Sequence, residues 1–225
     1  MAEMNYGVKA IETRYAGTVF RSRLEARWAA FFDVLGWPWT YEPFDLDGWS
    51  PDFMLQPVYT GRENSGGFEQ SNPVLVEVKP IDGFCAETAN RMSNALDKSG
   101  NELEPLLVGL SPFYQRHGLH FTNSLYHEDQ PVVGWLGEYM DYVQRRYFAE
   151  GQCHNYDAAV LRSGDTIPDN TEIKADFCHQ TGNWRHRITG YYDGTEGGLR
   201  RDVCQRYWGE ACNKVKYRAE ETTDA

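Results

Sequence analysis

A chain of 225 residues, with 41% hydrophobic and 14% aromatic residues, can bury a sizeable core, which argues against wholesale disorder. Its net charge of −11 argues against a broadly basic protein that coats DNA, although a local basic groove can sit on an acidic body. The sequence has no apolar run long enough to span a bilayer and no signal-peptide pattern after Met1, so we expect a cytoplasmic protein with no membrane partner.

The first predicted element is a helix between Thr18, as N-cap, and Gly36, as the residue that stops it. Its apolar residues recur at helical spacing and are Phe20, Leu24, Phe31, Phe32 and Leu35. Glu25 lies at the edge of this apolar stripe, one turn from Arg21 and from Trp28. Two interpretations stay open for Glu25: an ordinary boundary acid paired with Arg21, or an acid that reaches a site at the end of a sheet.

Three strands are predicted next, at residues 37–43, 51–55 and 74–79. Glu42, in the first of them, either supports a nearby site or faces solvent, and the sequence favours solvent. Residues 56–72 are rich in glycine and polar residues, which predicts a long hairpin loop between the second and third strands.

The second and third strands carry an unusual set of charges. Side chains alternate between the two faces of a strand, so Glu77 and Lys79 share one face while Val76 and Val78 point into a core. Burying a charge is costly unless it is paired or bound to metal. If the two strands pair, Asp52 lies beside Glu77, and two converging carboxylates form an oxygen site suited to Mg²⁺ or Mn²⁺.

The middle of the chain alternates further helices and strands. Residues 86–96 predict a helix with Arg91 outward, followed by a strand at 105–110 that is parallel to its neighbour across the helical crossover. A short strand at 132–136 and a helix at 138–148 complete what we expect to be the core, residues 1–150.

Residues 151–225 are expected to be an accessory region. Residues 155–201 are rich in glycine, aspartate and threonine and predict a small β-rich appendage. Residues 203–218 predict a helix that docks back on the core. Its apolar face is formed by Tyr207, Ala211 and Val215, with Trp208 and Cys212 alongside.

Two other patterns carry less weight. Pro168-Asp169 and Glu172-Ile173-Lys174 copy the letters of the acidic motif, but both acids lie in one segment and cannot occupy neighbouring strands. The five cysteines include no C-x₂-C pair, which is the usual zinc clip, so we expect free thiols in a reducing compartment.

The order of the acidic elements resembles the PD-(D/E)XK nuclease superfamily, in the branch of phage-type resolvase-like and transposon-end endonucleases. The resemblance spans roughly residues 14–110 and is carried, in the family's order, by the helix at 20–28, Tyr41-Glu42-Pro43, Pro51-Asp52 and Glu77-Val78-Lys79. It implies an α/β, restriction-endonuclease-like core, with a central mixed β-sheet flanked by helices.

The same resemblance implies a metal-dependent endonuclease that hydrolyses phosphodiester bonds in DNA, with branched or recombination DNA as one option. Asp52, Glu77 and the carbonyl of Val78 would hold Mg²⁺ or Mn²⁺, and Lys79 would orient the attacking water or stabilise the developing charge. Glu25 would complete the metal shell or hold a water. The candidate phosphate contacts are Arg21, Arg23 and Arg27.

This interpretation also predicts the partners. We expect the protein to bind DNA, with a homodimer as one option, and to use no small-molecule cofactor. If a phage encodes the chain, we expect the protein in the cytoplasm of the host. The alternatives from other classes are a catalytically weak nucleic-acid-binding module and a protein-inhibitor module on the same fold.

Overall fold

The structure is a computed structural model that describes residues 10–58, 72–101, 103–113, 131–139, 154–163, 173–179, 185–190 and 197–216. The tip of the predicted loop, at 59–71, and the acids of the copied motif, at 168–172, lie outside these ranges.

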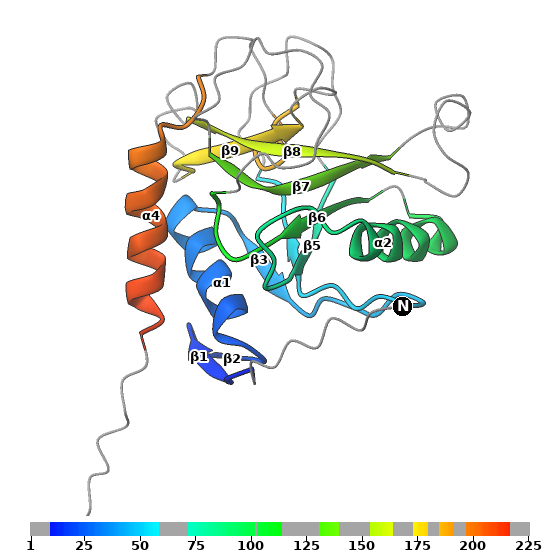
Figure 1. Ribbon diagram of the computed structural model, residues 1–225, viewed down its shortest axis with the longest axis horizontal. Helices are drawn as coiled ribbons and strands as arrows, with labels where there is room; N and C mark the ends of the chain where they lie inside the picture. The colour runs from blue at the N-terminus through cyan, green and yellow to red at the C-terminus, as the bar shows by residue number, and fades with distance from the viewer. Residues whose placement is uncertain are drawn as a thin grey trace, which may run out of the picture.

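The centre of the protein is a mixed sheet of seven strands (Figure 1). In spatial order the strands are β3 (Trp39–Tyr41), β4 (Phe53–Leu55), β5 (Val74–Val78), β6 (Glu104–Val108), β7 (Val132–Tyr139), β8 (His154–Ser163) and β9 (Ala175–His179). Among the strands of the described ranges, only the β5–β6 pair is parallel, and the helix α2 (Ala86–Ser99) connects it. The predicted helical crossover is therefore confirmed, and its reason is that parallel neighbours need a long connection.

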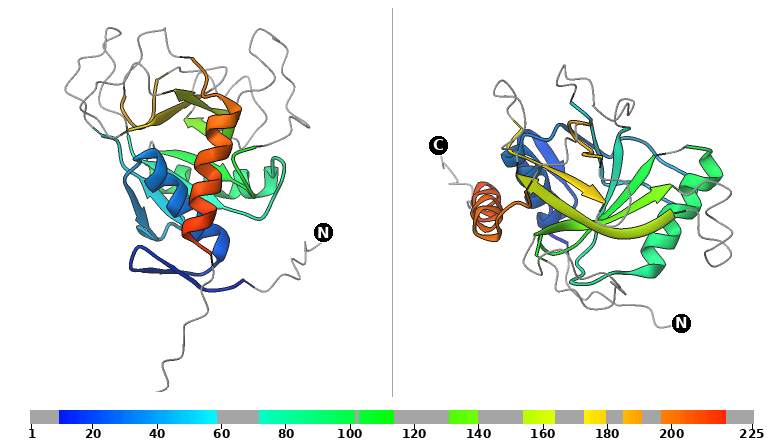
Figure 2. Two further views of the ribbon diagram at one scale, coloured as in Figure 1. Left: turned by 90° about the vertical axis from the view of Figure 1, so that its left-hand side faces the viewer. Right: turned by 90° about the horizontal axis from the view of Figure 1, so that it is seen from above.

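Helices cover both faces of the sheet (Figures 1 and 2). One core contains the apolar side of α1 (Arg23–Leu35) together with Val74, Val76 and Val78 of β5. The second core contains Leu75 of β5 and the buried side of α2. Residues of β5 therefore alternate between two packed layers, and α/β architecture with a central mixed sheet is confirmed. None of the helices in the described ranges is long and apolar enough to cross a membrane.

The predicted division into a core at 1–150 and an accessory region at 151–225 does not coincide with a boundary of the sheet. β8 pairs with β7 along a ladder from Val132–Val160 to Tyr139–His154, and β9 pairs with β8. These strands continue the central sheet and do not form a separate appendage, because their apolar faces pack into the same core as α1. The predicted start of a helix at Glu138 is also wrong, since Glu138 belongs to β7. Residues 140–148 lie outside the described part of the chain.

The carboxyl-terminal helix docks on the core as the sequence predicts. The helix α4 (Arg201–Lys214) lies alongside α1 (Figures 1 and 2). Trp208 of α4 contacts Trp28 and Phe31 of α1, with ring centroids 5.0 and 5.3 Å apart. Ala211 is fully buried, because a small side chain lets the two helices approach closely.

The first helix starts later than its apolar pattern suggests. Thr18 is not its N-cap but pairs with Tyr15 in a hairpin formed by β1 (Thr13–Tyr15) and β2 (Thr18–Phe20). The cap is Ser22, whose hydroxyl accepts from the backbone N–H of Glu25 at 3.1 Å. At the other end Gly36 stops the helix with φ 77°, as expected for a glycine in the left-handed region.

Ser22→Ala should therefore lower the free energy of unfolding by about 1 kcal/mol, because it removes the cap. Thr18→Ala, at the position that the sequence favoured, serves as the control and should change stability by less than half as much. Urea denaturation followed by circular dichroism measures both. Equal effects of the two substitutions would contradict the assignment of the cap.

Candidate functional site

A pocket of about 360 Å³ opens on the side of the sheet that α2 covers. Its wall is formed by residues from the β2–α1 junction, the turn before β4, the ends of β4 and β5, and α2. They are Arg21, Leu46, Gly48, Trp49, Ser50, Asp52, Glu77, Lys79 and Arg91. The pocket therefore collects five charged side chains from segments that are up to 70 positions apart in the sequence.

Asp52 comes directly before β4, and only 4% of its surface is exposed. β4 pairs with β5 so that Phe53 lies opposite Val76, which brings Asp52 next to Glu77. One carboxylate oxygen, Oδ2, accepts from the backbone N–H of Val78 at 2.7 Å. The other, Oδ1, accepts from Nη2 of Arg21 at 2.5 Å. The backbone of β5 thus fixes how this carboxylate points.

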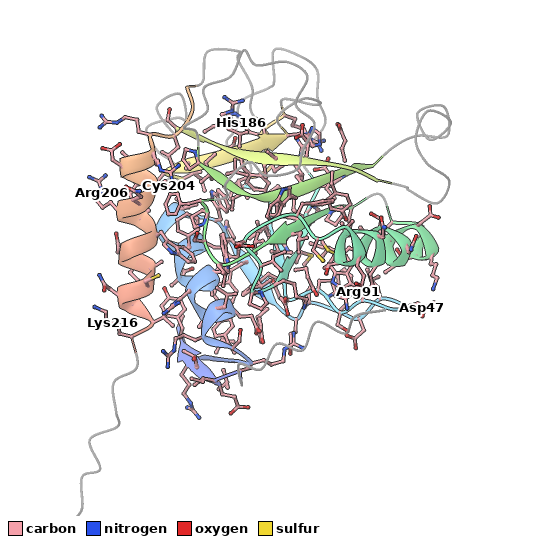
Figure 3. The ribbon with its side chains drawn as sticks, in the orientation of Figure 1. Asp47, Arg91, His186, Cys204, Arg206 and Lys216 are labelled. Carbon is pink, nitrogen blue, oxygen red and sulfur yellow. The ribbon has the colours of Figure 1, made fainter. Side chains whose placement is uncertain are left out.

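The carboxylate of Glu77 accepts from three side chains of the pocket. Its Oε1 accepts from Nζ of Lys79 and from Nη2 of Arg91, each at 2.7 Å. Its Oε2 accepts from the indole Nε1 of Trp49, also at 2.7 Å. Trp49 and Glu77 are both buried, so the bond between them is sheltered from bulk water. Figure 3 shows Arg91 beneath α2, toward the segment that carries Asp47.

The two carboxylates influence each other electrostatically. Burial and the nearby charge of Glu77 raise the pKa of Asp52 to about 7, although the Val78 N–H and Lys79 act in the opposite direction. Desolvation and a like charge both disfavour the ionised form of an acid. Asp52 therefore changes its charge near neutral pH, whereas an ordinary aspartate is ionised there.

Glu25 does not line the pocket. It is the third residue of α1, and its Oε1 accepts from the Ser22 hydroxyl at 2.7 Å. Its Oε2 accepts from the hydroxyl of Tyr41 at 2.6 Å, and burial together with this bond raises the pKa of Tyr41 to about 12. Arg21 lies at 4.0 Å from the same oxygen. Glu25 therefore holds the hydroxyls of the cap residue Ser22 and of Tyr41 behind Arg21, and it contributes to the raised pKa of Asp52.

The three candidate arginines separate in the structure. Arg21 lines the pocket, whereas Arg23 and Arg27 do not. Arg27 lies on the side of α1 that faces α4, where its charge lowers the pKa of the Cys212 thiol, although burial raises that pKa overall. The Val78 side chain packs in the core between β5 and α1, and its backbone N–H donates to Asp52.

Sequence reasoning missed Trp49 and Arg91. The helical pattern of α2 places Arg91 next to the buried Met92, at the boundary between the buried and exposed faces, and a long side chain there can reach a neighbour. Trp49 follows Gly48, which has φ 89°, in a tight loop where Leu46 and Trp49 exchange backbone bonds at 2.8 and 3.2 Å. A glycine-tryptophan pair just before Pro51-Asp52 was the available signal.

The donors in the pocket fit a hard divalent cation with few protein ligands. In the part of the chain that the structure describes, no group of three or more His, Cys, Asp and Glu side chains is arranged to hold a metal ion. Mg²⁺, however, commonly uses one or two carboxylates and keeps several waters. Asp52 and Glu77, side by side in a polar pocket, supply such a pair.

Trp49→Phe should weaken divalent-ion binding severalfold, because it keeps the ring but removes the N–H that orients Glu77. Calorimetric titration with Mn²⁺ measures the change. Trp39→Phe is a matched control, since the Trp39 indole donates to Asp33 at 2.8 Å, away from the pocket. Unchanged affinity in Trp49→Phe would show that Glu77 needs no such support.

Comparison of the chain with protein-family models, with curated proteins and with solved structures finds no significant match. A function for the pocket is therefore argued from its own geometry.

Proposed function

We propose that the protein is a metal-dependent nuclease that hydrolyses phosphodiester bonds in DNA. The observation that carries this proposal is that Asp52, Glu77 and Lys79, from two adjacent strands, line one pocket together with two arginines. Carboxylates for a hard cation, a lysine and further bases are the groups that phosphodiester hydrolysis requires.

Each residue has a role that its position supports. Asp52 and Glu77 would hold Mg²⁺ or Mn²⁺, with the Val78 carbonyl as an additional ligand on the same strand. The bound ion would supply an activated water and polarise the phosphate. Lys79, whose side chain is about one third exposed, stands at the mouth of the site, where it can orient that water or stabilise the charge that develops on the phosphate.

The charge of the pocket supports an anionic substrate. Asp52 and Glu77 carry at most two negative charges, while Arg21, Lys79 and Arg91 carry three positive ones. A divalent cation would leave this pocket strongly positive on an otherwise acidic protein. The backbone of a nucleic acid would neutralise this excess of positive charge, because each phosphodiester carries one negative charge.

One observation favours a different function, that of a nucleic-acid-binding module with little catalytic activity. The oxygens of Asp52 and Glu77 are already paired with residues of the chain itself, so the pocket is stable without a metal. In that function the pocket would be a rigid structural unit, and the three bases would still face a phosphate backbone.

A nicking assay on supercoiled plasmid and on branched DNA separates the two. We expect cutting with Mg²⁺ or Mn²⁺ and none with EDTA. DNA binding that is retained without any cutting, at any divalent-ion concentration, would refute the nuclease and support the binding module. The Lys98→Ala variant, a surface lysine that pairs with exposed Asp47, controls for loss of a positive charge.

A further inference from the structure

Arg21 occupies an unusual position between two acids. Its Nη2 donates to Asp52 Oδ1 inside the pocket at 2.5 Å, and its Nε lies 3.0 Å from Oε1 of Glu42. Asp52 is buried, whereas the Glu42 side chain is about half exposed. The guanidinium therefore bridges one acid that a metal would need and one acid that stands outside the pocket.

The backbone of Arg21 is held in place, whereas its side chain is mostly exposed and is held by its ion pairs with Glu42 and Asp52. Its N–H donates to the Tyr41 hydroxyl at 3.2 Å, and Tyr41 in turn is held by Glu25. More than half of the Arg21 side chain is exposed, so solvent surrounds most of it. A change of partner at Asp52 thus requires only rotation of the side chain and no movement of α1.

Glu42 is held beside Asp52 in a strained backbone conformation. It has φ 44°, in the left-handed region that residues other than glycine rarely adopt. Its N–H donates to the backbone carbonyl of Asp52 at 2.9 Å. The chain therefore accepts a strained residue at the position that presents a carboxylate to Arg21.

We infer that Arg21 is a resident cation that exchanges with the divalent ion, an inference that rests on the proposed function. Without the ion, Arg21 neutralises Asp52. Oδ2 of Asp52 is held by the Val78 N–H, so the ion binds at Oδ1, where Arg21 donates. The two positive charges repel each other at that one oxygen, so Arg21 leaves Asp52 and stays tethered to Glu42. The released Nη2 then donates to a phosphate oxygen of the DNA. Arg21 thereby couples occupation of the metal site to binding of the substrate.

The first test measures ion affinity by calorimetry with Mn²⁺ on the full chain. Arg21→Ala should bind Mn²⁺ about tenfold more tightly than wild type, because it removes the competing charge from Asp52. Arg21→Gln keeps the length of the side chain and should change affinity in the same direction. Arg23→Ala removes a charge two residues further along, at the first position of α1 and outside the pocket, and should leave the affinity unchanged.

A double-mutant cycle with Glu42→Gln separates exchange from simple long-range attraction. Glu42→Gln alone should weaken Mn²⁺ binding severalfold, because Arg21 loses the acid that receives it. In the Arg21→Ala background the same substitution should have little effect. An equal effect of Glu42→Gln in both backgrounds would overturn the exchange, since Glu42 would then act directly on the ion.

The substrate half of the inference is tested by DNA binding in the Lys79→Ala background, which should not cut. Mg²⁺ should tighten binding of a short labelled DNA duplex, and adding Arg21→Ala should remove most of that gain and reduce the salt slope by about one. An undiminished gain in the double variant would overturn the phosphate contact.

Failure of this inference is distinguishable from failure of the proposed function. If wild type cuts DNA with Mg²⁺ but Arg21→Ala binds Mn²⁺ no more tightly, the exchange is wrong and the nuclease stands. If wild type binds Mn²⁺ and cuts nothing, the nuclease is wrong, and the affinity of Arg21→Ala still decides the exchange. If neither wild type nor Arg21→Ala binds any divalent ion, both are wrong.

Discussion

Asp52→Asn and Glu77→Gln should each abolish divalent-ion binding and DNA cutting, whereas Lys79→Ala should lose cutting alone. The amide substitutions keep the shape of the side chain, so the Val78 N–H and the Trp49 indole still find an oxygen. They remove the negative charge that a hard cation requires. In Lys79→Ala, Glu77 keeps its bonds to Arg91 and Trp49, so the ion site stays intact.

The loss of rate in Lys79→Ala should be ~10²-fold or more, as for other groups that stabilise a transition state. Calorimetry with Mn²⁺ and plasmid nicking measure the two properties separately. Thermal unfolding should show that all three variants fold, because none of the substitutions opens a cavity. Ion binding in Asp52→Asn at wild-type affinity would contradict the assignment of Asp52 as a ligand.

Ion binding should weaken roughly 100-fold between about pH 8 and about pH 5, because the ion needs the ionised form of Asp52. The pKa of Asp52 is raised to about 7 by burial and by Glu77, so its ionised fraction falls about tenfold for each pH unit below that value. Below neutral pH, binding should therefore release a proton from Asp52. Titrations in buffers with different ionisation enthalpies measure that release.

The same shift predicts a pH dependence of stability with a definite sign. The folded protein holds the Asp52 proton more tightly than the unfolded chain does, since the pKa is raised from 3.8 to about 7. The contribution of this group to stability is therefore fully present below about pH 4 and is lost as pH rises to about 7. Asp52→Asn should remove this slope from urea-denaturation midpoints. An affinity for Mn²⁺ that is independent of pH would refute the expectation for ion binding, and a slope that persists in Asp52→Asn would refute the expectation for stability.

The alternation of residues along the sequence was sufficient to predict how Glu77, at the centre of the site, is oriented. The alternation in residues 74–78 predicts that Val76 and Val78 face one core while Glu77 faces the other way, and β5 has this arrangement. The run from Pro51 to Leu55 correctly predicts a neighbouring strand, although β4 begins only at Phe53. Gly36 correctly predicts where α1 stops. These features depend on backbone geometry within a few residues, which the sequence encodes directly.

The helix start shows where periodicity misleads. Phe20 fits the apolar spacing of α1 but belongs to β2, because it packs against Tyr41 and Phe53 from the hairpin. The Ser22-x-x-Glu25 pattern carried the correct start, since it is the sequence signature of a capping box. Ser22 accepts from the Glu25 N–H as in that motif, while the Glu25 carboxylate accepts from the Ser22 hydroxyl. The same pattern also gives Glu25 a structural role that needs no metal.

Tertiary structure alone decided which arginines meet the two acids of the pocket. Arg21, just before α1, reaches Asp52, while Arg27, on α1, faces α4. Arg91 turns from the surface of α2 toward Glu77. Trp49 enters the pocket only because its loop folds back over β5. Long side chains on separate elements find partners according to how the elements pack, and no local pattern encodes that. Likewise, β8 and β9 joined the central sheet because pairing with β7 buries their apolar faces, which composition could not reveal.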